Sequence, residues 1–260
     1  MMSMKTAWKV TVAVLAALLV LLLIAEFGLR AYIADQIRSD FAAEAPDAAA
    51  ADAADVSFGA SPVTFGLLRG ALPHVEMTTP STLSINGDTY SGQPGATINA
   101  DNLRVVDGRQ VADSVRITTE LPEDYVRAIL QQQLADGFRQ SGGGPLSFLQ
   151  ELITVTGVTS HPDAGTFTID VSGGAAAVDL RPMMNNGQLA FEASSTELFG
   201  FQLPDTVAEA LTGALQQGVQ DTLNGEMQVE SFDVVDGGLR VTVAGRDVDL
   251  DNLSQSGAAG

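Results

Sequence analysis

The sequence predicts an α+β protein in which an N-terminal transmembrane helix precedes one domain of curved antiparallel sheet wrapped around two long helices. Three observations support this fold class. Residues 7–25 are apolar except for Lys9 and Thr11, which gives about the length that a helix needs to cross a bilayer. After residue 55, short alternating segments separated by Gly-rich turns indicate strands. Two helical segments, each opening on Leu-Pro and an acidic residue, interrupt these strands.

The apolar segment is predicted to be an uncleaved signal anchor. Lys5 and Lys9 lie before it or at its start, and no acidic residue lies there. The N-terminus is therefore expected in the cytoplasm and the rest of the chain outside the cell membrane. A cleaved signal peptide is the alternative, but Leu23-Ile24-Ala25 and Tyr32-Ile33-Ala34 lack the small residue three positions before the cleavage point. No Cys follows, which excludes lipoprotein processing.

Composition limits the partners and the chemistry of the exported part. From Glu26 onward the chain has 11 Arg, no Lys and all 32 acidic residues, a net charge of −21. Such a surface repels phosphate backbones, so we expect no nucleic-acid partner. The absence of Cys rules out disulfides, thiolate catalysis and Cys-ligated metals. No motif indicates a cofactor.

The sequence divides into four parts. Residues 1–25 form a cytoplasmic stub and anchor, 26–54 a juxtamembrane helix and linker, 55–253 the α+β domain, and 254–260 a disordered tail. In the second part an apolar residue recurs every fourth position, which predicts an apolar stripe that either lies on a plain stalk helix or packs on the domain; we favour packing. The stripe consists of Leu29, Ile33, Ile37 and Phe41.

The domain begins with a strand at residues 56–59 and a compact apolar segment, Pro62–Gly70, predicted to be a short helical turn against the sheet. A Gly-rich stretch, residues 86–95, is predicted to be a loop. Strands at 97–106 and 111–119 then flank Asp107-Gly108, a hairpin signal.

The first long helix is predicted to begin at Pro122, within Leu121-Pro122-Glu123, and its apolar residues share one face. Four strands with Gly- and Asn-rich turns are predicted next, at residues 153–159, 166–171, 176–180 and 188–193. The second long helix is predicted from Leu203-Pro204-Asp205 to Leu223, and a hairpin at residues 229–235 and 239–243 closes the domain.

Catalytic and metal-binding signals are weak, so we predict no enzyme and no metal. The only histidines are His74 and His161, without a Gly-x-Ser-x-Gly or His-Glu-x-x-His motif. The alternating residues Asp247, Asp249 and Asp251 could hold calcium if they share a strand face, but a solvated edge that resists strand addition is the favoured alternative.

Several stretches resemble the LmeA-like phospholipid-binding proteins of actinobacterial cell envelopes. They are Ala25–Ala34, Pro62–Gly70, the two Leu-Pro-acid helix starts and the closing hairpin Val234–Val241, in this order along the chain. The resemblance implies a single α+β domain whose curved antiparallel sheet holds helices and encloses an apolar lipid site. It also implies a role in the outer envelope, binding phospholipid and supporting lipoglycan (mannan-type) assembly. Many members look exported and released, whereas this chain is expected to keep its anchor.

The leading hypothesis is therefore a membrane-anchored, extracytoplasmic (periplasmic) phospholipid-binding domain with an apolar groove or tunnel, although periodicity alone fits a closed core equally well. The alternative is a non-catalytic adaptor that binds an envelope glycosyltransferase or wall protein without carrying lipid. The expected partners are phospholipid, the membrane through the N-terminal helix, and an envelope glycosyltransferase. The candidate lipid-binding residues lie on the short apolar turn and the two long helices: Phe65, Leu67, Leu68, Val126, Ile129, Leu130, Leu134, Leu211 and Leu215.

Overall fold

The computed structural model describes residues 20–39, 54–140, 154–185, 188–198, 201–202 and 227–250. Its first element is a helix over residues 20–39, called the N-terminal helix below. The elements that follow are, in order, β1 (Asp55–Ser57), α3 (Val63–Leu68), β2 (Ala71–Thr79), β3 (Ser84–Asn86), β4 (Thr89–Ser91), β5 (Ala96–Val106), β6 (Arg109–Pro122), α4 (Glu123–Gln140), β7 (Val155–His161), the short 3-10 helix η2 (Pro162–Ala164), β8 (Thr166–Val171), β9 (Ala176–Asn185), β10 (Gln188–Leu198), β11 (Phe201–Gln202), β12 (Met227–Val235) and β13 (Gly238–Asp249).

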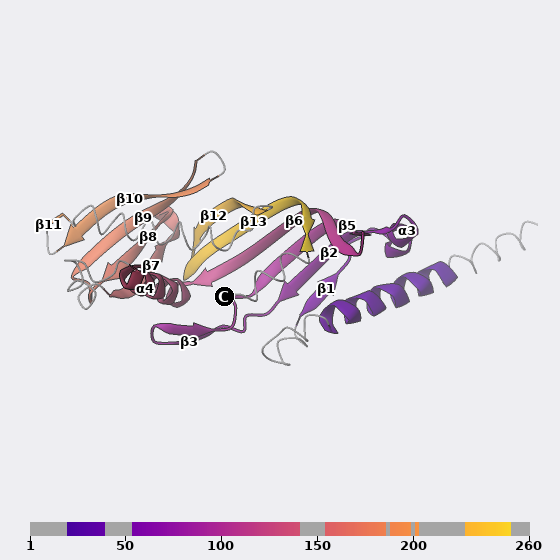
Figure 1. Ribbon diagram of the computed structural model, residues 1–260, viewed down its shortest axis with the longest axis horizontal. Coiled ribbons are helices and arrows are strands. Elements are labelled where there is room, and N and C mark those ends of the chain that lie inside the picture. The colour runs from indigo at the N-terminus through magenta and orange to yellow at the C-terminus, as the bar shows by residue number, and fades with distance from the viewer. Residues whose placement is uncertain are drawn as a thin grey trace, which may run out of the picture.

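A six-stranded antiparallel sheet forms the middle of an elongated molecule (Figure 1). Its strand order is β1-β2-β5-β6-β13-β12, so the closing hairpin pairs with β6 rather than starting a separate layer. Alternate residues of the central strands form a small core in which Ala112 and Val248 are fully buried. Opposite-charge pairs such as Arg116–Glu230 and Arg240–Glu120 lie on an exposed face, where such pairs contribute little stability.

The turn between β5 and β6 confirms the predicted Asp-Gly hairpin. Asp107 and Gly108 both have positive φ angles, 53° and 81°. That conformation matches the right-handed twist of the flanking strands and suits Gly and Asp better than other residues. The turn fixes the register of the long β5–β6 pair from Val106 and Arg109 back to Ala96 and Thr119.

A five-stranded antiparallel sheet, β11-β10-β9-β8-β7, lies at one end of the molecule with α4 packed on it (Figure 1). Alternating residues of β8 and the inner face of α4 form the largest core, in which Phe167, Ile169 and Leu130 are fully buried. The core extends across the junction to the other sheet, because Phe191 of β10 meets Phe232 of β12 edge-on, with 5.5 Å between ring centroids.

The predicted loop over residues 86–95 was wrong in part, because its first half pairs as the β3–β4 hairpin. This hairpin is held to α4 by an edge-to-face contact between Tyr90 and Tyr125, with 4.8 Å between ring centroids. Arg127 of α4 also donates to Asp88 at 2.7 Å. Both contacts need residues far apart in sequence, so local patterning could not reveal them.

The N-terminal helix packs on the six-stranded sheet instead of forming a plain stalk. Its stripe residues Leu29, Ile33 and Ile37 lie against a core that includes Val56 and Phe58. The prediction that the stripe packs on the domain is thus confirmed for these three residues, while Phe41 lies outside the described residues. The spacing of four residues is what keeps the stripe on one side of the helix.

The α+β class and the antiparallel pairing are confirmed, but the strands do not form one curved sheet. They divide into two open sheets and a hairpin, because β6 pairs with β13 on one side while β7 to β11 pair only with one another. The first long helix is confirmed as α4, which begins at Glu123, one residue after the predicted Pro122. The second, predicted at residues 203–223, lies outside the described residues, as does the tail at 254–260.

In the described parts of the chain, no helix is both long enough and apolar enough to cross a membrane. Residues 7–19 of the predicted anchor are not among those parts. The anchor therefore stays a prediction from the sequence.

The core assignment predicts unequal effects at two neighbouring positions of α4. Leu130→Ala should lower the free energy of unfolding by about 2–5 kcal/mol, because it removes fully buried methyl groups and leaves a cavity. Ile129→Ala, the matched control, should cost only about 1 kcal/mol, since this side chain is half-buried. Urea unfolding of the two variants measures the difference, and equal losses would contradict the assignment.

Candidate functional site

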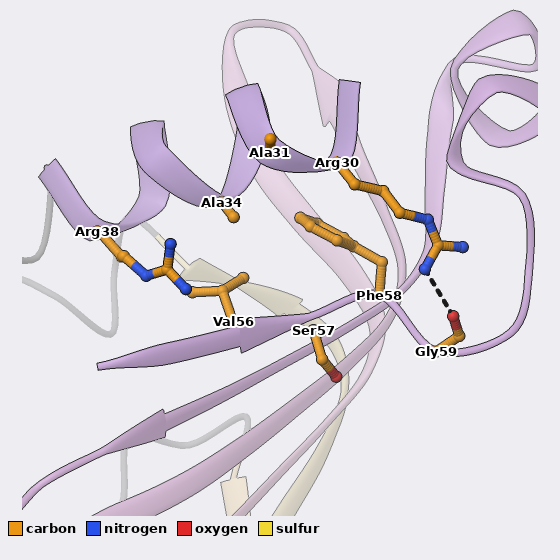
Figure 2. Close-up of a pocket in the computed structure, with 8 residues that line it drawn as sticks. All are labelled: Arg30, Ala31, Ala34, Arg38, Val56, Ser57, Phe58 and Gly59. Carbon is orange, nitrogen blue, oxygen red and sulfur yellow. Dashed lines mark hydrogen bonds between the residues drawn. The ribbon is translucent and has the colours of Figure 1, made fainter. Parts of the chain in front are cut away.

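An open pocket of about 560 Å³ lies between the N-terminal helix and the strand β1, a volume in the range of ligand sites (Figure 2). Phe58 rises between the helix and the strand, and two arginines stand at opposite ends (Figure 2). The residues that line the pocket are Arg30, Ala31, Ala34, Arg38, Val56, Ser57, Phe58 and Gly59.

Helical spacing and small side chains produce this pocket. Arg30, Ala34 and Arg38 recur every four residues, so they share one face of the helix, and Ala31 lies beside them. The two alanines carry only a methyl group and leave a hollow between the helix and the strand. Larger residues on the neighbouring stripe keep the helix seated on the sheet, so the hollow does not collapse.

Hydrogen bonds fix both arginines in place. Arg30 donates from Nε to Glu26 at 2.7 Å and from its terminal nitrogens to the carbonyls of Gly59 and Ser61, at 2.9 and 2.8 Å. Arg38 donates from Nε to the carbonyl of Ala54 at 3.0 Å. Backbone carbonyls fix the orientation of both guanidinium groups, while the ionised Glu26 carboxylate offsets much of the charge of Arg30.

The charged side chains that line the pocket are all basic, in an otherwise acidic protein. Its lining contains two arginines and no acidic residue, whereas the chain as a whole carries a net charge of −19. Asp55 stands outside the lining, 3.7 Å from the Arg38 guanidinium, and is largely exposed to solvent. An anionic group bearing an apolar chain matches this combination of charge and Phe58.

Glu26 joins the N-terminal helix to α3. Its carboxylate accepts hydrogen bonds from the backbone N–H groups of Val63 and Thr64, at 2.7 and 2.9 Å, and from the Thr64 hydroxyl at 2.6 Å. Burial raises the pKa of Glu26, but the hydrogen bonds from Thr64, Arg30 and Val63 outweigh it and lower the pKa from 4.5 to about 2. The carboxylate is thus charged at any physiological pH.

Helix α3 carries an exposed apolar surface. Val63 and Gly66 face inward, and Gly66 is required there because a Cβ would come within 2.4 Å of both the Ala71 carbonyl and Pro73. Phe65 and Leu68 face outward and are 56% and 84% exposed, and Leu67 is also exposed. The predicted helical turn is confirmed, while its three candidate residues line no part of the pocket.

The other candidate residues fall into two groups. Val126, Leu130 and Leu134 of α4 are buried in the core against the five-stranded sheet, and Ile129 beside them is half-buried. The structure thus buries three of these four side chains in this core, and their role in lipid binding stays a prediction. Leu211 and Leu215 lie outside the described residues.

Neither histidine forms a triad with a hydroxyl and a carboxylate. His74 contacts Asp101 through Nδ1 at 2.7 Å. The nearby Ser114 hydroxyl donates to the same carboxylate and not to the imidazole. The hydrogen bond to His74 is the main cause that lowers the pKa of Asp101. His161 contacts only Thr168, at 2.9 Å, among the described side chains.

The alternating aspartates do not share one environment. Asp247 has a positive φ of 52° and is largely exposed, while Asp249 is buried and forms an ion pair with Arg109 at 3.2 Å. Asp251 lies outside the described residues. Among the residues that the structure describes, no cluster of three or more His, Asp or Glu side chains could hold a metal ion.

Sequence reasoning missed the residues that build the pocket. Glu26 and Arg30 were visible as an acid and a base four residues apart, a spacing that favours an ion pair on a helix. Nothing in the sequence pointed from either residue to Gly59, Ser61 or Val63, because these contacts span about thirty residues or more.

Comparison with known proteins gives one match. Residues 24–244 match the model of a protein family described as LmeA-like phospholipid-binding. No curated protein and no solved structure matches the chain.

The Glu26 junction predicts the behaviour of two backbone amides in the full-length chain. Glu26→Gln should speed hydrogen exchange at Val63 and Thr64 about 10- to 100-fold, because a hydrogen bond to a charged group contributes about 1.5–3 kcal/mol. Glu123→Gln is the matched control, since Glu123 accepts from the Ser160 amide at 2.6 Å. It should affect Ser160 alone; unchanged exchange at Val63 and Thr64 in Glu26→Gln would contradict the junction.

The same junction has a defined pH dependence. The folded pKa of Glu26 is depressed, so its stabilising contribution is complete above about 4.5 and is lost as the pH falls towards 2. Protection of the Val63 amide should therefore stay constant from pH 7 to pH 5 after correction for intrinsic exchange. A loss of protection within that interval would show that the carboxylate is not the acceptor.

Proposed function

Since this chain belongs to the LmeA-like phospholipid-binding family, we propose that it is a membrane-anchored extracytoplasmic protein that holds a phospholipid in the pocket beside its N-terminal helix. The observation that carries this proposal is the position of the pocket. The helix that supplies half of its lining continues directly from the apolar segment of residues 7–25. A lipid bound there stays next to the membrane from which it came.

The lining suits the two chemical parts of a phospholipid. The guanidinium groups of Arg30 and Arg38 offer N–H donors to the phosphate, a group that arginine recognises well, and the exposed Asp55 offsets the charge of Arg38 only weakly. Phe58 and Val56, with Ala34 across from them, offer apolar surface to the start of an acyl chain. Each buried CH₂ contributes about 0.8 kcal/mol, so partial enclosure of a chain supplies useful affinity.

The wider role follows from the anchor and the family. In this proposal the chain is a single-pass protein of the cell membrane, its domain faces outward, and it binds lipid without catalysing a reaction. It supports envelope lipid or lipoglycan assembly of the actinobacterial type, with an envelope glycosyltransferase as the protein partner that receives or uses the lipid. An apolar tunnel would need the second long helix, which the described residues do not include.

The adaptor role is the alternative, in which the same surface contacts a wall protein and carries no lipid. The two functions differ in one measurable property. A lipid-binding protein retains phospholipid at a fixed ratio through purification, whereas an adaptor does not.

A pocket-filling substitution tests the proposal. Ala31→Trp should displace the lipid, because an indole occupies the hollow above Phe58, while the exposed position of Ala31 keeps the helix folded. Tyr32→Trp is the matched control, since Tyr32 is exposed and does not line the pocket. Native mass spectrometry of the full-length chain in detergent should find one phospholipid on the wild type and Tyr32→Trp, and none on Ala31→Trp.

Two results would contradict the proposal. A wild-type chain free of phospholipid, even after incubation with phospholipid micelles, would favour the adaptor. Equal retention by Ala31→Trp and Tyr32→Trp would place the lipid elsewhere in the protein.

A further inference from the structure

We infer that α3 and the β5–β6 turn form an apolar edge that enters the interfacial region of the bilayer holding the N-terminal helix. The edge consists of Phe65, Leu67, Leu68, Val105 and Val106. This inference rests on the anchoring part of the proposed function. It adds to it a second membrane contact, made by the folded domain itself.

The edge joins two segments that are distant in sequence. Ala71, three residues after α3, pairs with Arg104 of β5, so the next residues, Val105 and Val106, extend past the end of β2 on the side of α3. Val105 is 71% exposed, comparable to Phe65 and Leu68 of α3. Large exposed apolar side chains gathered at one end of a domain indicate a contact surface rather than scattered surface residues.

The Glu26 junction places this edge at the level of the membrane surface. The predicted span ends at residue 25, and the next residue binds the first two N–H groups of α3. Because a helix rises only about 1.5 Å per residue, α3 begins within a few ångströms of the end of the span. Figure 1 shows α3 at the same end of the molecule as the start of the N-terminal helix.

Charge and size favour a bilayer over a protein as the occupant. Residues 62–70 contain Arg69 and no acid, and the β5–β6 turn carries Asp107 close to Arg109, so the edge lacks the excess of acidic residues by which the rest of the chain repels anionic lipids. One six-residue helix and one turn tip offer much less area than the roughly 800 Å² per partner of a stable protein interface. Aromatic and aliphatic side chains of this kind sink about 5–10 Å into the headgroup region.

The edge also lies next to the pocket. Gly59 lines the pocket and Arg30 binds the Ser61 carbonyl, while α3 begins at Val63. The short segment from residue 59 to 63 thus connects the two features. A phospholipid displaced from the outer leaflet beside α3 has a direct route to the arginines.

Single-cysteine labelling of the full-length chain tests the inference, because the natural sequence has no Cys to remove. Leu68→Cys and Val105→Cys report on the edge, and Phe27→Cys on the anchor. Met184→Cys is the matched control, an exposed apolar position in the other sheet. Each variant carries an environment-sensitive fluorophore and is reconstituted into phosphatidylethanolamine–phosphatidylglycerol vesicles with or without a lipid bearing a quencher near its headgroup.

The expected result is a blue shift and quenching of the labels at positions 27, 68 and 105, with the label at 184 unchanged. Quenching at 27 without quenching at 68 and 105 would overturn the inference and leave the anchor intact. Quenching at none of the four would overturn both the inference and the anchoring. Equal quenching at 68 and 184 would also overturn it, since the contact would then not be specific to the edge. Phospholipid retention in the pocket is measured separately by the Ala31→Trp comparison, so the two failures are distinguishable.

Discussion

The hydrogen bonds of the Glu26 carboxylate are the interaction on which the arrangement of the N-terminal helix, α3 and the pocket depends. Glu26 directly follows the apolar segment. Its carboxylate accepts three hydrogen bonds from Val63 and Thr64, the first two residues of α3, and one from Arg30. Arg30 in turn fixes the segment before α3 through two backbone carbonyls. One partly buried charge thus positions a helix, a loop and one end of the pocket together.

Apolar residues serve two different purposes at the two ends of the molecule. At the far end the apolar face of α4 packs on the five-stranded sheet together with residues of β12 and β13, so Leu130 and its neighbours lie within a folded core. At the other end the N-terminal helix already covers β1 and β2, and Val63 of α3 contributes to that core. The other apolar residues of α3, Phe65, Leu67 and Leu68, do not take part in this core and stay exposed.

This division explains how much the sequence could reveal. Hairpins, the start of α4 and the stripe on the N-terminal helix depend on local spacing, and the predictions for Asp107-Gly108, Glu123 and Ile33 agree with the structure. The location of a lipid site depends instead on which apolar faces find a partner. Leu68 and Leu130 have the same chemistry and both lie on helices, and only the tertiary contacts separate an exposed edge from a closed core.

The pocket could not be predicted from the sequence for a related reason: it exists because the helix carries small side chains where larger ones would fill the space. Ala31 and Ala34 are unremarkable in a helix, and their small size matters only because Phe58 and the strand β1 lie opposite them. The apolar stripe on the same helix packs on the sheet and keeps the helix and the strand together. The helix can therefore carry large side chains on one face and small ones on the adjacent face. A single helix therefore supports both the pocket and the contact with α3, so any shift of this helix on the sheet must also move the walls of the pocket.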